Sequence, residues 1–109
     1  MANFAAASKE KILAYLGYGF SDENEGYVLE AMQRVQSLSD GTLSTNAVSR
    51  VEGWLAQLDT IQTKINTERD IDGSTLLAPL RTEGRRFVQL VANALGLDKQ
   101  IDIFGTSGT

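Results

Sequence analysis

Two groups of closely spaced carboxylates have the residue types that acid–base chemistry or metal binding requires. They are Asp22, Glu23 and Glu25, and Glu68, Asp70 and Asp72. Catalysis by such a pair needs an environment that raises the pKa of one member. Neither group adjoins an apolar stretch and both fall where helix ends are expected, so we expect solvated or dipole-stabilised acids. The segment starting at Asp70 is superficially similar to a calcium loop, but its twelfth position is Arg81 instead of the required glutamate.

Several other classes of site are excluded by residue types that the chain lacks. It contains no cysteine and no histidine, which removes disulfides, thiol nucleophiles, histidine-based triads and the usual zinc sites. The absence of cysteine fits a reducing compartment such as the cytoplasm. We therefore expect a protein that is not an enzyme and that carries no metal or cofactor.

Charge and hydropathy restrict the partners. The 109 residues have a formal net charge of −4 and a pI of about 4.7, which argues against a general nucleic-acid binder and against a protein that coats anionic membranes. No segment reaches the ~18 consecutive apolar residues of a membrane-spanning helix. The first eleven residues do not have the basic start and apolar run of a signal peptide.

The arginines Arg81, Arg85 and Arg86 form a basic group in an otherwise acidic chain. They lie in the first half of an expected helix, where the helix dipole disfavours cations, and Glu83 offsets only one of them. A solvated basic face is one interpretation. The other is an intersubunit contact, because arginine binds carboxylates with two parallel hydrogen bonds. The acidic partners would come from another copy, namely Asp22, Glu23, Glu25 and Glu30.

Helical periodicity dominates the chain and predicts an all-α fold. Val48, Val51, Leu55, Leu58 and Ile65 recur at steps of three and four, and Trp54 and Ile61 widen this line into a face. A helix from Ser44 to about Arg69 would be about 38 Å long. It would form the spine of a small domain against which shorter helices pack.

Three shorter helices and a C-terminal arm complete the predicted four-helix, bundle-like domain. The expected ranges are a first helix capped by Asn3 or Ser8 and ending near Leu16, a second from Ser21 to about Ser39, and a last one starting between Ser74 and Pro79 and ending at Gly96. Gly17 is a predicted left-handed helix end, at least one of Tyr18 and Phe20 should be buried, and Leu43 should point inward. Short connections near Asp40 and Asp72 predict that consecutive helices are nearly antiparallel.

We expect residues 1–97 to form the helical domain and residues 98–109 to form the arm. Ile101, Ile103 and Phe104 are its apolar residues. The arm either folds back onto its own helices or leaves the domain to bind a partner. The tip, residues 106–109, is predicted to be mobile without such a partner. Gly84 lies in the middle of the last helix, where glycine costs about 1 kcal/mol relative to alanine. One interpretation is the close approach of another helix at that turn, and the other is neutral drift.

The C-terminal region resembles a known family. The run from Gly84 to Leu97, followed by Asp98 and by Ile103-Phe104-Gly105, is similar to the end of the head–tail connector proteins, or neck adaptors, of tailed bacteriophages. The chain length, the helix order and the long central helix are similar in outline. The resemblance covers the end of the last helix in detail and the remainder of the chain only in outline.

This resemblance implies a structural role in the virion. Such adaptors form a ring, commonly of about twelve copies, beneath the portal protein, and closed rings need head-to-tail subunit contacts. The ring extends the DNA channel and carries the next neck or tail protein. The arm would engage the portal through Ile101, Ile103 and Phe104. An acidic channel wall would let DNA pass without specific binding, because like charges repel.

Two other classes of function remain open. One is a small helical regulator or tail-assembly chaperone that binds another polypeptide as a monomer or dimer. The other is a DNA-binding helical domain that uses Arg81, Arg85 and Arg86, for which duplex affinity would fall steeply with salt.

Overall fold

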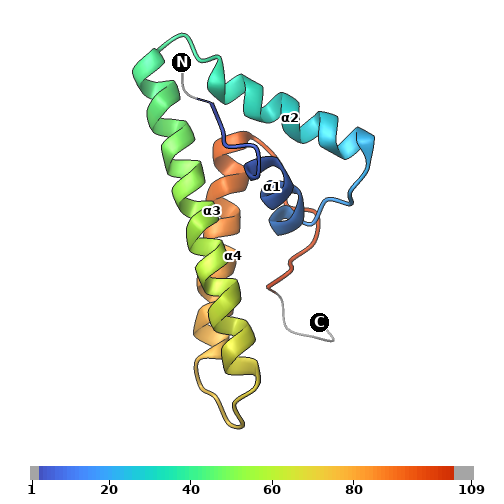
Figure 1. Ribbon diagram of the computed structural model, residues 1–109, viewed down its shortest axis with the longest axis vertical. Helices are drawn as coiled ribbons and strands as arrows, with labels where there is room; N and C mark the ends of the chain where they lie inside the picture. The colour runs from blue at the N-terminus through green and yellow to red at the C-terminus, as the bar shows by residue number, and fades with distance from the viewer. Residues whose placement is uncertain (1–2, 105–109) are drawn as a thin grey trace.

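The computed structural model describes residues 3–104 and is built from four α-helices (Figure 1). These are α1 (Ser8–Leu16), α2 (Asp22–Gln36), α3 (Gly41–Arg69) and α4 (Leu77–Leu95). The described residues contain no β-strand, which confirms the all-α prediction. The predicted spine is also confirmed, because α3 is the longest helix at 29 residues.

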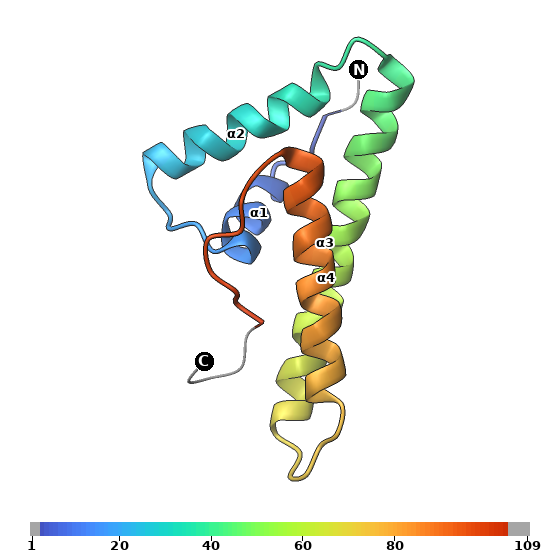
Figure 2. The ribbon, with the colours of Figure 1, turned by 180° about the vertical axis from the view of Figure 1, so that it is seen from behind.

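The helices form an elongated molecule with extents of 50 × 28 × 20 Å. α3 and α4 lie side by side as an antiparallel hairpin along the long axis, whereas α2 leans away from the start of α3 (Figures 1 and 2). α1 sits in the angle between α2 and the hairpin. The prediction of nearly antiparallel neighbours is therefore confirmed for α3 and α4 but wrong for α2 and α3, because α1 occupies the space between them.

One hydrophobic core joins all four helices. Its largest fully buried side chains are Ile12, Leu16, Val28, Val51, Leu55, Leu58, Val88 and Val91. Burying each such side chain contributes about 1.5–3 kcal/mol before the entropy cost of folding. The predicted face of α3 is inside, including Ile61 and Ile65, and Trp54 packs against the core while partly exposed. The hairpin continues beyond α1 and α2, so that its far end consists of α3 and α4 alone (Figure 1).

Glycines end two helices as predicted. Gly17 follows α1 with φ of 82° and Gly96 follows α4 with φ of 70°, a conformation that lacks a steric cost only for glycine. After Gly96, the Leu97 amide donates to the Ala92 carbonyl at 2.9 Å and the leucine side chain is buried. This is the hydrogen bond that closes a helix with a left-handed cap and a returning apolar residue.

The helix starts differ more from the predictions. Ser21 caps α2 as expected, but neither Asn3 nor Ser8 caps α1, whose first turn has no side-chain cap. α3 begins three residues before Ser44, because the Asp40 carboxylate accepts hydrogen bonds from the amides of Thr42 and Leu43 at 3.0 and 3.1 Å. The earlier start places Leu43 on the outer side of the first turn, where it is 54% exposed instead of pointing inward.

Ser44 has a different role from the predicted cap. It is buried, and its hydroxyl donates to the carbonyls of Val35 and Gln36 at 2.9 and 3.0 Å. These carbonyls are at the end of α2, so Ser44 joins the last turn of α2 to the first turn of α3.

Candidate interaction surfaces

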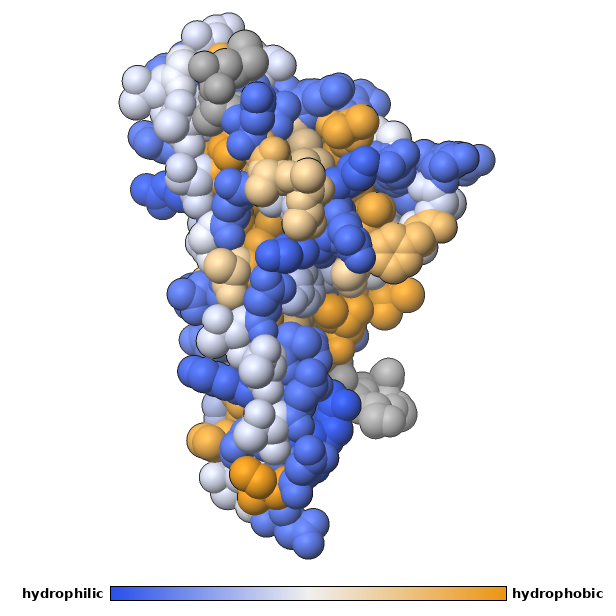
Figure 3. Space-filling model, in the orientation of Figure 1, coloured by the Kyte–Doolittle hydropathy of each residue, from blue (hydrophilic) through white to orange (hydrophobic). Residues whose placement is uncertain are grey.

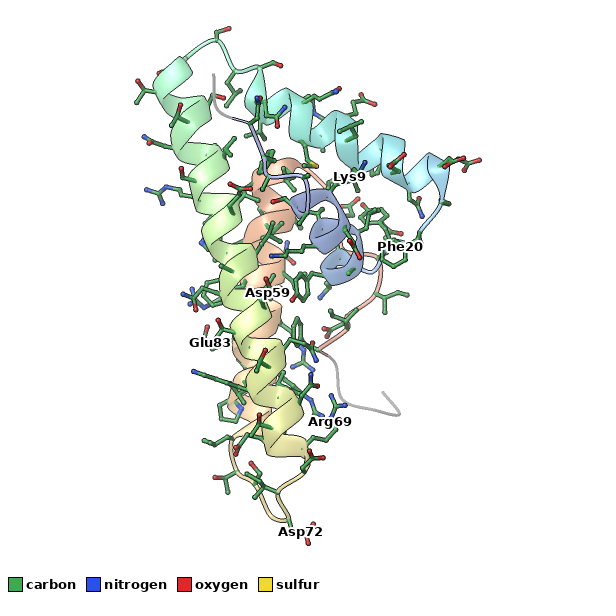
Figure 4. All side chains as sticks on the ribbon, in the orientation of Figure 1. Lys9, Phe20, Asp59, Arg69, Asp72 and Glu83 are labelled. Carbon is green, nitrogen blue, oxygen red and sulfur yellow. The ribbon has the colours of Figure 1, made fainter. Side chains whose placement is uncertain are left out.

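The two acidic groups lie in different parts of the molecule, and no described group of three or more carboxylates has the arrangement of a metal site. Asp22, Glu23 and Glu25 occupy the first turn of α2, where they face the positive end of the helix dipole. Glu25 is ion-paired with Lys9 of α1 at 2.7 Å. In the second group Glu68 accepts a hydrogen bond from the Ser74 hydroxyl at 2.7 Å, while Asp72 is at the hairpin tip (Figure 4).

The arginines are less free than the sequence suggests. Arg85 is paired with Asp102 of its own C-terminal arm at 2.8 Å. Arg86 is paired with Glu83 at 3.0 Å and lies over the ring of Phe87, 4.7 Å from its centroid. The partner of Arg85 therefore comes from outside its own helix but from its own chain, because the fold brings a residue 17 positions away beside it.

Arg81 makes no ion pair with any residue between 3 and 104. On the acidic side of the predicted contact, Glu30 pairs with Arg34 of its own helix at 3.5 Å. The contact between the arginines and the acids of another copy stays a prediction, since it involves a second chain.

The described part of the C-terminal arm, residues 98–104, folds back onto the body. The amides of Gln100 and Ile101 donate to the Leu16 carbonyl at 2.8 and 3.4 Å. The Tyr18 hydroxyl donates to the Asp98 carbonyl at 2.8 Å, and burial is the largest of the effects that raise the pKa of this tyrosine. The predicted mobile tip lies outside the described residues.

Phe104 anchors the arm in its own chain. Its side chain is 2% exposed and its ring stacks on Tyr15, with centroids 6.3 Å apart and 13° between the planes. Phe104 is thus held inside its own chain in this structure, and its predicted contact with the portal, which involves a second protein, stays a prediction. Ile101 and Ile103, by contrast, are 62% and 41% exposed, so these two residues remain accessible.

Two glycines make room for the arm. A Cβ atom on Gly17 would lie 2.6 Å from the Ile101 nitrogen, and one on Gly84 would lie 2.7 Å from the ring of Phe104. Gly84 was expected to admit a neighbouring helix; its neighbour is the arm instead. The glycine correctly indicates a close approach, but it does not identify which segment approaches.

A polar cluster between α1 and α3 was not found from the sequence. The Tyr15 hydroxyl donates to Asp59 at 2.5 Å, and Lys11 is ion-paired with the same carboxylate at 2.7 Å. Burial, the hydrogen bond to Asp59 and the Asp59 charge all raise the pKa of Tyr15. Burial alone would raise the pKa of Asp59, but the hydrogen bonds from Lys11 and Tyr15 and the Lys11 charge outweigh it and lower the pKa. The sequence offers one signal of this cluster, which is the position of Asp59 directly after the buried Leu58.

An apolar groove runs between α3 and α4 in the far half of the hairpin. It has a volume of about 480 Å³ and is lined by Thr63, Lys64, Thr67, Glu68, Leu76, Pro79, Leu80 and Glu83. Hydrophobic surface near the hairpin end is visible in Figure 3. Sequence reasoning missed this groove, although Leu76 and Pro79 at the start of the predicted helix were a signal of apolar side chains outside the core.

A second apolar surface lies on the opposite side of the molecule. Phe20 is 71% exposed and projects from the turn between α1 and α2, and hydrophobic surface gathers there in Figure 3. Of the two aromatics expected in this turn, Tyr18 is buried and Phe20 is not. Figure 4 shows Phe20 on one side of the molecule and Glu83, which borders the groove, on the other.

No family model, curated protein or solved structure matches the chain. No helix among residues 3–104 has the length and apolar character needed to cross a membrane.

Proposed function

We propose that this protein is a structural adaptor of a bacteriophage neck. Copies form a ring beneath the portal, extend the DNA channel and join the head to the tail. The role is one of assembly and involves no chemical step. The proposal starts from the resemblance of the C-terminal region to neck adaptors, and the structure adds one observation in its favour.

That observation is the pair of exposed apolar surfaces on opposite sides of an elongated helical molecule. Isolated exposed apolar residues are normal, whereas grouped ones suggest sites of protein contact. The first surface is the groove between α3 and α4. The second is around Phe20, with Ile101 and Ile103 of the arm exposed as well. A subunit of a ring has two neighbours and needs two different surfaces, one for each.

The acidic character of the chain supports the same role. A net charge of −4 per copy disfavours tight contact with phosphates, so a channel made of many copies would let DNA slide. In this arrangement the exposed Ile101 and Ile103 contribute to the contact with the portal, whereas Phe104 holds the arm to its own subunit.

The test has two stages. We expect native mass spectrometry of the purified chain at rising concentration to show a closed oligomer, and electron microscopy to show rings. We then expect added protein to bind DNA-filled heads that carry a portal but no neck, and not empty heads without a portal. A chain that remains monomeric at high concentration and binds neither kind of head contradicts the adaptor role. A monomer or dimer that binds a soluble tail protein instead would indicate an assembly chaperone.

A further inference from the structure

We propose that the groove between α3 and α4 binds the Phe20 turn of a second copy of this chain. The Phe20 turn is residues 17–21, and the hairpin groove is the apolar groove described above. The inference rests on the proposed function, because it assigns the subunit contact of the ring, and it commits to one occupant.

The groove is suited to an aromatic side chain. Leu76, Pro79 and Leu80 supply apolar walls, and Thr63 and Thr67 line the groove from α3. Both threonine hydroxyls are already donated within the helix, to the carbonyls of Asp59 and Thr63. The groove therefore offers apolar surface with few unsatisfied polar groups, which is the environment in which a buried aromatic anchor contributes most to binding.

The Phe20 turn is suited to insertion. Phe20 is the most exposed large apolar side chain in the described part of the chain. The backbone on both sides of Phe20 is held in place. The Asn24 side chain donates to the Gly19 carbonyl at 2.8 Å, and Ser21 caps α2. An aromatic residue that is held in place before binding loses little conformational entropy when it is buried.

Charges beside the two surfaces are partly complementary. At the groove, Glu83 is paired with Arg86, and the Glu68 carboxylate accepts a hydrogen bond from the Ser74 hydroxyl. Neither Lys64 nor Glu68 makes an ion pair with any residue from 3 to 104, so the groove offers one unpaired positive charge, at Lys64, beside the negative charge of Glu68.

Next to Phe20 the unpaired charges are negative. Asp22 and Glu23 follow the turn directly and have no ion-pair partner among the described residues. Insertion of Phe20 would bring these acids to Lys64 and to Arg81 on the neighbouring α4. Complementary charges of this kind fix orientation and suppress wrong pairings. Of the three arginines in the predicted contact with the acids of another copy, only Arg81 takes part in this arrangement, together with Lys64.

The placement of the surfaces determines the kind of assembly. Because Phe20 and the groove lie on opposite sides of the molecule (Figure 4), one copy cannot fill its own groove. Each copy can accept one neighbour and insert into another, which is a heterologous contact that closes into a ring or continues as a filament.

The test uses two single variants of the full chain that each remove one side of the contact. Phe20→Ser removes the inserted side chain and keeps the groove. Thr67→Trp fills the groove and keeps Phe20. Both positions are exposed, so we expect circular dichroism to show unchanged helicity. Leu43→Ser is the matched control, because Leu43 is also an exposed apolar residue but belongs to neither surface.

We expect each variant to lower self-association at least about tenfold, as loss of one buried anchor does, and Leu43→Ser to associate like the wild type. An equimolar mixture of Phe20→Ser and Thr67→Trp restores one contact per pair. Analytical ultracentrifugation should therefore show 1:1 dimers that do not grow further.

Two results would overturn the inference: association of Phe20→Ser at wild-type strength, or no dimer in the mixture. These outcomes are separate from failure of the adaptor role. If both variants still form rings that bind heads, the adaptor role is supported and the proposed contact is ruled out. If the mixture forms dimers but wild-type assemblies do not bind heads, the proposed contact is supported and the adaptor role is ruled out.

Discussion

Gly84 and Phe104 form a contact that depends on the absence of a side chain at position 84. The ring of Phe104 occupies the space that a side chain at position 84 would fill. The glycine weakens α4 by about 1 kcal/mol relative to alanine, whereas burial of the phenylalanine contributes about 1.5–3 kcal/mol. Glycine is tolerated in the middle of this helix because the burial of Phe104 stabilises the fold by more than the helix loses.

The close fit of Phe104 on Gly84 predicts that Gly84→Ala lowers stability in the wild type but raises it in a chain that lacks the Phe104 ring. In the wild type, Gly84→Ala displaces Phe104 and should lower stability by about 1 kcal/mol, or roughly 4–8 °C in Tm. In a Phe104→Ala chain the space is empty, so the same change should raise stability by about 1 kcal/mol through helix propensity. Thermal melting followed by circular dichroism measures both. A loss of stability in both backgrounds would show that something other than Phe104 fills the space.

At the scale of residues, the sequence supplies residue types but not partners. The run of arginines is plain in the sequence, yet the ion pair from Arg85 to Asp102 depends on the return of the arm across α4. Gly84 likewise signals a close approach without identifying Phe104. Interactions between residues far apart in the chain become visible only when the fold is known.

At the scale of elements, the polar cluster of Lys11, Tyr15 and Asp59 joins the short α1 to the middle of α3. α1 has nine residues and no side-chain N-cap, and isolated helices of this length are marginal in water. Its stability thus comes from tertiary contacts: packing, this cluster, the ion pair of Lys9 with Glu25 and the hydrogen bond from Ser8 to Glu52.

The cluster predicts a loss of stability at alkaline pH. In the unfolded chain Tyr15 ionises near the ordinary tyrosine pKa of about 10, whereas in the folded protein its pKa is higher. The unfolded state therefore binds fewer protons above about pH 10, and stability falls as the pH rises through that range. Urea unfolding should show that the advantage of the wild type over Tyr15→Phe shrinks between about pH 9 and pH 11. A constant difference between the two proteins would contradict the raised pKa.

Element types were predictable here because their signals are local. Apolar residues at steps of three and four define α3, and Gly17 and Gly96 define two helix ends. The start of α3 was misplaced because Asp40, Ser44 and Thr45 are all good caps. The choice among them depends on Ser44 being buried against the end of α2, which is a tertiary effect.

For the whole molecule, the described part of the arm, residues 98–104, contributes to the fold, which is one of the two alternatives that the sequence left open. A chain that ends at Leu97 loses Phe104, the ion pair of Arg85 and the hydrogen bonds to Leu16 and Tyr18. We expect the four helices to remain folded but the free energy of unfolding to fall by about 2–4 kcal/mol. Urea denaturation measures this, with a chain that ends at Phe104 as the control. Equal stability of the two shortened chains would mean that the arm does not stabilise the body.

The arrangement of the helices was the part least accessible from the sequence. Short connections correctly predict the antiparallel α3 and α4, but the same rule fails for α2 because it ignores where α1 packs. The groove was missed for a related reason. Leucines at the end of a helical stripe are assigned to the core unless one knows that α1 and α2 do not extend that far.

The far end of the hairpin, where α3 and α4 have only each other, differs from the remainder in how it would move. Local opening is least costly where few apolar contacts are lost, so this end can fray and reform while the four-helix body stays intact. A neighbour seated there would suppress that motion, and subunit contact would then stiffen each copy as well as hold it in place. An assembled ring would on this account be more rigid than the free chains from which it forms.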